Sequence, residues 1–112
     1  MRTHLCGEVS ELLADQSVNQ KDVDFVVMDI QGYEAKAIAG GLSLFCLAPP
    51  LMMEMDHVHV DSPQRLDEIC CSVEKHYQWF HDLDDMTCTR RSISSLRTHF
   101  AKFTGYRDIL LF

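Results

Sequence analysis

The chain has 112 residues, 46% hydrophobic and 24% charged, a composition that is typical of one globular domain and argues against disorder. Its formal net charge of -7 excludes a nucleic-acid backbone or an anionic membrane as the main partner, because either would require a clustered basic surface. Five cysteines without C-x-x-C spacing predict neither a disulfide framework nor a zinc site. With no apolar run of membrane-spanning length and no signal peptide recognised, we expect a cytoplasmic protein.

The first half of the chain predicts helices alternating with strands. Apolar residues near position 10 recur at helical spacing and predict a short amphipathic helix. Residues 24–30 form an apolar run that Gly32 ends, which is typical of a buried strand leading into a helix. The apolar residues that define the first helix and the helix after Gly32 are Val9, Leu12 and Leu13, and Ala35, Ile38, Ala39 and Leu42.

The second half continues the alternation. Residues 51–60 predict a second strand, apolar at first and alternating later. Ser62 and Pro63 then mark a helix start, with Ser62 as the N-cap and proline at the first helical position. We further expect a strand at 79–83, a helix at 93–103 and a strand at 106–112. The order predicts an α/β fold, with a mostly parallel sheet and helices on both of its faces.

Polar residues follow the first predicted strand at its carboxyl end. In open α/β sheets ligands bind at the carboxyl ends of the strands, so Asp29, Gln31, Tyr33 and Glu34 are candidate functional residues. The alternative is structural, because Asp29 and Glu34 can also accept backbone N–H groups or stabilise the start of the next helix. Glu54, in the second predicted strand, lies near the same crevice and requires a hydrogen-bond partner if it is buried.

The segment 23–34, VDFVVMDIQGYE, followed by Ile38 and Gly40, resembles the signature of the FkbM-type methyltransferases. In that family an apolar strand is followed by Asp-x-Glu/Gln-Gly-x-Glu and, about a turn later, by an apolar residue and a glycine. The resemblance continues more weakly through residues 50–55 and 108–112. It implies a Rossmann-like methyltransferase fold that uses S-adenosylmethionine, typically to methylate a hydroxyl oxygen of a small molecule or sugar.

The resemblance also assigns roles to individual residues. It implies that Asp29 and Glu34 are catalytic, with Asp29 orienting or deprotonating an acceptor hydroxyl. Gln31, Tyr33 and Glu54 would bind the acceptor substrate. No cofactor-binding residue is assigned, and no metal ligand. One departure lies inside the signature, where Met28 stands at a position that is lysine in many relatives.

Residues 1–112 are expected to form a partial domain that corresponds to the carboxyl-terminal half of the family fold. The five glycines form no G-x-G-x-x-G turn of the kind that lets a cofactor approach the backbone. We therefore expect weak or no binding of S-adenosylmethionine by this chain alone. The strand at 24–30 would lack its usual neighbour, so its exposed edge is expected to pair with another chain.

Two other functions remain open from the residues themselves. One is a non-catalytic remnant or interaction module that keeps half of a Rossmann sheet. The other is a metal-dependent enzyme, because His57, His59 and Asp61 would share one face of an extended strand, the spacing of a two-histidine, one-carboxylate site. An H-x-H pair alone is common at strand ends, and no further ligand is indicated.

Overall fold

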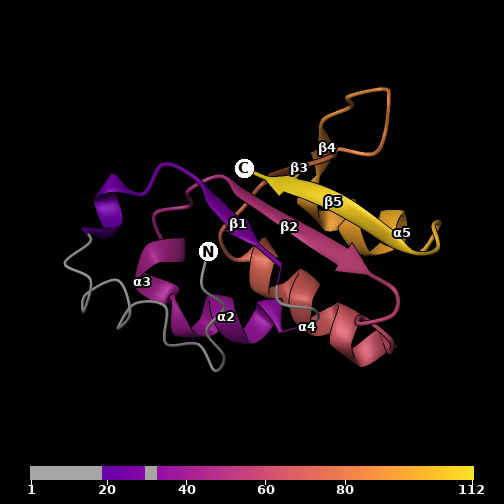
Figure 1. Ribbon diagram of the computed structural model, residues 1–112, viewed down its shortest axis with the longest axis horizontal. Coiled ribbons are helices and arrows are strands. Elements are labelled where there is room, and N and C mark those ends of the chain that lie inside the picture. The colour runs from indigo at the N-terminus through magenta and orange to yellow at the C-terminus, as the bar shows by residue number, and fades with distance from the viewer. Residues whose placement is uncertain (1–18, 30–32) are drawn as a thin grey trace.

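The computed structural model describes residues 19–29 and 33–112, and its centre is a β-sheet with helices packed against it (Figure 1). Within these residues the sheet has five strands in the order β1-β2-β5-β3-β4. The strands are β1 (Val26–Met28), β2 (Leu51–Asp56), β3 (Trp79–Asp82), β4 (Arg91–Ser92) and β5 (Tyr106–Leu111). The helices are η1 (Gln20–Asp22), α2 (Glu34–Gly40), α3 (Leu42–Phe45), α4 (Pro63–Glu74), η2 (Ile93–Ser95) and α5 (Leu96–Phe100).

The α/β class is confirmed, but the prediction of a mostly parallel sheet was wrong. Only β1 and β2 pair in parallel among the described strands, whereas β2 with β5, β5 with β3 and β3 with β4 are antiparallel. The reason is the short strand β4, which the sequence pattern did not reveal. It forms a hairpin with β3 and reverses the chain, so the crossover through η2 and α5 delivers β5 parallel to β4 and antiparallel to β3.

One face of the sheet is buried beneath the helices. Alternate residues of β2, Leu51, Met53 and Met55, are fully buried, whereas Met52 and Glu54 between them are only partly buried. The buried side chains of α2, α4 and α5 belong to the same core cluster as these strand residues. The predicted helix cover on both faces is therefore not seen in the described part of the chain. We call the other side, with Val27, Met52, Leu110 and His81 in register across four strands, the open face.

Local hydrogen bonds explain where several predicted elements end. The predicted strand at 51–60 stops at Asp56, because its side chain accepts a hydrogen bond from the backbone N–H of Val58 (3.0 Å) and turns the chain. The start of α4 is confirmed, with the Ser62 hydroxyl accepting from the backbone N–H of Arg65 at 3.1 Å. The helix predicted at 93–103 is shorter and divides into η2 and α5.

Two further expectations concern the predicted first helix and membrane-spanning segments. The helix predicted around Val9, Leu12 and Leu13 lies outside the described residues. Within the residues that the structure describes, no helix is both long enough and apolar enough to cross a membrane.

Candidate functional site

The candidate site lies at the carboxyl ends of the parallel strands β1 and β2 (Figure 1). Asp29 directly follows β1 and is exposed, and Glu54 lies on the open face near the end of β2. Asp108 of β5 is the cross-strand partner of Glu54 and is the site residue that the sequence reasoning missed. Its strand was predicted, but only the antiparallel register of β5 against β2 places its carboxylate beside Glu54.

The carboxylates at this edge are close enough to perturb one another. Partial burial raises the pKa of Glu54, and the negative charges of Asp29, Asp108 and Asp56 raise it further, with His59 acting in the opposite direction. Burial likewise raises the pKa of Asp108, with added contributions from Asp84, Asp29 and Asp82. We call Asp29, Glu54 and Asp108 the acidic edge. A carboxylate with a raised pKa is a stronger proton acceptor than an ordinary one, which suits hydrogen bonding to an acceptor hydroxyl.

The predicted site residues after β1 occupy the start of α2. Tyr33 is the N-cap residue of α2 and is 43% exposed, so its ring can meet a ligand. Glu34, in the first turn, is fully buried, which favours a role in ordering the turn over direct contact with a substrate. Gln31 lies outside the described residues.

Two cationic side chains surround Tyr33. The Lys36 ammonium lies 5.3 Å from the centre of the Tyr33 ring, and the Arg65 guanidinium carbon lies 5.9 Å from it. Arg65 comes from the first turn of α4 and also donates a hydrogen bond to the His59 carbonyl at 3.1 Å. The candidate site therefore consists of the acidic edge and of Tyr33, Lys36 and Arg65, which lie near the starts of α2 and α4.

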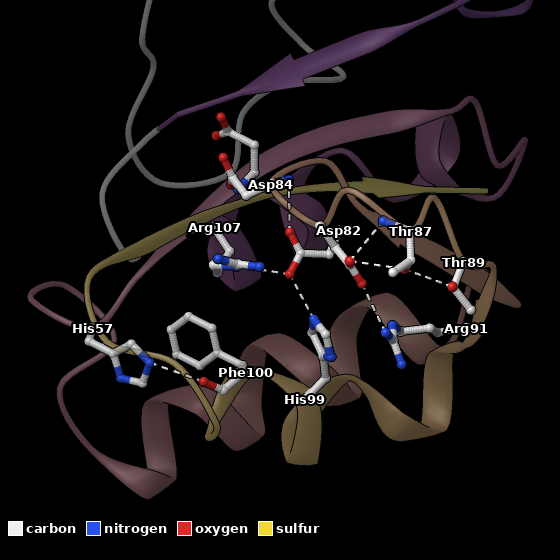
Figure 2. Close-up of polar contacts among 11 residues, drawn as sticks. His57, Asp82, Asp84, Thr87, Thr89, Arg91, His99, Phe100 and Arg107 are labelled. Atoms are coloured by element: carbon white, nitrogen blue, oxygen red, sulfur yellow. Dashed lines mark hydrogen bonds and ion pairs between the residues drawn. The ribbon is translucent and has the colours of Figure 1, made fainter.

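The geometry proposed for a metal site is not present. Because β2 ends at Asp56, His57 and His59 do not extend along a common strand face. The His57 ring instead stacks on Phe100, with ring centres 3.9 Å apart, and its Nε2 lies 3.1 Å from the Phe100 carbonyl oxygen (Figure 2). In residues 19–29 and 33–112, no group of three or more His, Cys, Asp or Glu side chains is arranged to hold a metal ion.

A second cluster of titratable residues connects β3, α5 and β5 (Figure 2). The Asp82 carboxylate is fully buried, and its Oδ2 lies 2.7 Å from Nε2 of His99 and 2.8 Å from Nε of Arg107. Its Oδ1 accepts from the backbone N–H of Asp84 at 2.9 Å. Burial alone raises the pKa of Asp82, but the hydrogen bonds from His99, Arg107 and Asp84 outweigh it and lower the pKa. With every carboxylate oxygen occupied, this cluster serves to join the elements.

The described glycines do not lie in a turn of the G-x-G-x-x-G kind. Of these glycines, Gly40, Gly41 and Gly105, only Gly105 has a positive φ, and it lies in the turn before β5 with no atom close to the position of an added Cβ. The glycine-rich cofactor turn is therefore not formed by these three glycines.

Comparison with known proteins identifies the family. The family model described as the methyltransferase FkbM domain matches residues 4–92, which is most of the chain. Searches of curated proteins and of solved structures gave no match. The match contains the strand β1, the residues after it and β2, which carry most of the candidate site. The chain therefore belongs to the FkbM methyltransferase family.

Proposed function

We propose that this chain is the acceptor-binding part of an S-adenosylmethionine-dependent methyltransferase that acts on a hydroxyl oxygen of a small molecule or sugar. The observation that carries the proposal is the acidic edge, where the family motif residue Asp29 meets Glu54 and Asp108 at the ends of paired strands. The β1-β2 pair with α2 between its strands is also what a Rossmann-like half-domain requires.

The roles of the residues follow from their exposure and charge. Asp29 is exposed and accepts the proton of the acceptor hydroxyl, which increases the nucleophilicity of that oxygen. Glu54, with its raised pKa, accepts a hydrogen bond from the acceptor and fixes its orientation. Glu34 orders the turn that presents Asp29 and Tyr33. When bound, the cofactor supplies the methyl group.

The acceptor-binding role can be tested with two matched aspartates that flank β1. Asp29 follows the carboxyl end of the strand, and Asp24 precedes its amino end; both are exposed. We expect Asp29→Asn to weaken binding of hydroxyl-bearing acceptors, and Asp24→Asn to leave it unchanged. The measurement is a ¹H–¹⁵N NMR titration of the full chain with a panel of sugars and small alcohols.

Methyl transfer itself is assayed with S-adenosylmethionine carrying an isotopic label in its methyl group, using acceptors selected by the titration. Label in an ether product that depends on Asp29 supports the proposal. Equal effects of the two substitutions on acceptor binding, or transfer that does not need Asp29, would contradict the assigned role. Calorimetric titration with S-adenosylmethionine separately measures whether the chain binds the cofactor.

A second candidate function is an interaction module that uses the edge of β1. Among the described residues β1 pairs only with β2, so its other edge has no strand beside it. Phe25 and Val27 next to this edge are 49% and 42% exposed. An apolar strand edge of this kind pairs readily with another strand. Methyl transfer by the chain without any added partner would favour the enzyme over this alternative.

A further inference from the structure

Lys36 and Arg65 differ from the other described cationic side chains in that both lie near the same aromatic ring, that of Tyr33. Arg91 pairs with Asp85 at 2.9 Å, Arg97 with Asp67 at 2.6 Å and Arg107 with Asp82 at 2.8 Å. Neither Lys36 nor Arg65 forms an ion pair in the part of the chain that the structure describes, and both converge on Tyr33 instead. Two positive charges near one ring repel each other, so a negatively charged group that contacts both would be stabilised.

We propose that Tyr33, Lys36 and Arg65 bind a phosphate group of the acceptor substrate. The inference rests on the proposed function for the identity of the acceptor, and on the geometry alone for the anion. A phosphate ester carries up to two negative charges, which matches the two cations better than the single charge of a carboxylate does.

The position of the Arg65 side chain suits it to bind such a ligand. Its NH1 donates to the His59 carbonyl, which fixes the side chain in place, and the guanidinium has further N–H groups that can donate to phosphate oxygens. Its backbone lies in the first turn of the twelve-residue helix α4, where the helix dipole also favours a negative charge. Tyr33 and Lys36 are exposed and Arg65 is partly exposed, so a ligand from solvent can reach all three.

The position of this group explains how it would act in the reaction. Tyr33 follows β1 in the same motif that carries Asp29. Arg65 donates a hydrogen bond to the backbone of His59, and the charge of His59 acts to lower the pKa of Glu54. Phosphate bound by Lys36 and Arg65 would therefore leave the rest of the acceptor free to extend toward the acidic edge. The opposite charges of the two regions give the acceptor one orientation and disfavour the reversed one.

The test is an NMR titration of the full chain, without cofactor and at constant ionic strength, with inorganic phosphate, glucose 6-phosphate and glucose. We expect saturable shifts at Tyr33, Lys36 and Arg65 with both phosphates. Glucose 6-phosphate should also shift Asp29 and Glu54, which separates a phosphorylated acceptor from free phosphate. The double substitution Lys36→Gln and Arg65→Gln should weaken phosphate binding by about tenfold or more.

The matched control is Lys75→Gln with Lys102→Gln, which removes two positive charges from exposed positions elsewhere. It should leave phosphate binding unchanged. The proposal is overturned if phosphate gives no saturable shift at Tyr33, Lys36 and Arg65, or if the control weakens binding as much as the site variant. Because neither measurement involves methyl transfer, loss of the phosphate site and failure of the proposed enzyme function give different results.

Discussion

Substitution of Asp82 by Asn should destabilise the fold more than any change to a surface ion pair. Oδ2 of Asp82 forms hydrogen bonds with both His99 and Arg107, and Oδ1 accepts a hydrogen bond from the backbone N–H of Asp84. An asparagine has one oxygen and one NH₂ group. In one orientation its NH₂ group faces the Arg107 N–H donor, and in the other it faces the backbone N–H of Asp84. The substitution also leaves the Arg107 guanidinium, only 17% exposed, without its carboxylate.

The expected size of the effect follows from these contacts. Removing one partner of a buried ion pair costs about 3–5 kcal/mol. We expect the lower end, about 3 kcal/mol, because Arg107 keeps its stacking on Phe103, with the guanidinium carbon 3.8 Å from the ring centre. For a domain of this size, a loss of about 3 kcal/mol lowers the Tm by about 12 °C.

Urea unfolding followed by circular dichroism measures the free energy of unfolding of each variant. The matched control is Asp67→Asn, which breaks the pair between Asp67 and Arg97, whose side chains are 61% and 44% exposed. That pair should contribute about 1 kcal/mol or less. If Asp82→Asn costs no more than Asp67→Asn, the buried cluster does not hold β3, α5 and β5 together and the reasoning fails.

The lowered pKa of Asp82 predicts how the stability difference between the wild type and Asp82→Asn changes with pH. The pKa of Asp82 lies below its ordinary value of 3.8 in the folded protein, so its charged form stabilises the fold at every pH above that value. The stabilisation is lost as the pH falls from 3.8 through the lowered pKa. The difference in free energy of unfolding between the wild type and Asp82→Asn should therefore narrow as the pH falls below 3.8.

Two further predictions concern the acidic edge and the cysteines. Burial and repulsion by neighbouring carboxylates raise the pKa of Glu54, so its charge destabilises the fold at pH 7 and Glu54→Gln should increase the free energy of unfolding there. This gain should vanish below the ordinary pKa of 4.5. The control Glu74→Gln, at an exposed position, should show no such gain. A decrease on Glu54→Gln at pH 7 would contradict the repulsion. Burial raises the pKa of the Cys70 thiol to about 11, so at pH 8 iodoacetamide should modify its exposed neighbour Cys71 and leave Cys70 unmodified until urea unfolds the chain, as peptide mass spectrometry would show. Equal modification of the two thiols in the folded protein would refute this.

The sequence predicted those residues of the candidate site that lie within one short motif, and it did not predict those that tertiary contacts place there. Asp29, Tyr33 and Glu34 follow an apolar strand and a glycine within one short motif, so their position at a strand end was readable from residues 24–34. Asp108 was not readable as a site residue, because its place beside Glu54 depends on a pairing between segments about fifty residues apart. Arg65 was not readable as a site residue either, because its approach to Tyr33 depends on how α2 and α4 pack.

The failed metal hypothesis has a similar cause. An H-x-H pattern places two histidines on one face only if the strand continues through them. The turn at Asp56, made by one side chain to backbone hydrogen bond, ends the strand before His57. The pattern of residues was correct, but the assumed backbone was not.

The sequence by itself determined the α/β class, the helix start at Ser62 and the family signature around Asp29, because each depends on residues that are neighbours along the chain. Only the tertiary structure decided the direction of β5, the one-sided helix cover of the described sheet, and the meeting of Glu54 with Asp108. These features depend on the pairing of distant strands, which is selected by burial of one sheet face against the helices and not by any local pattern.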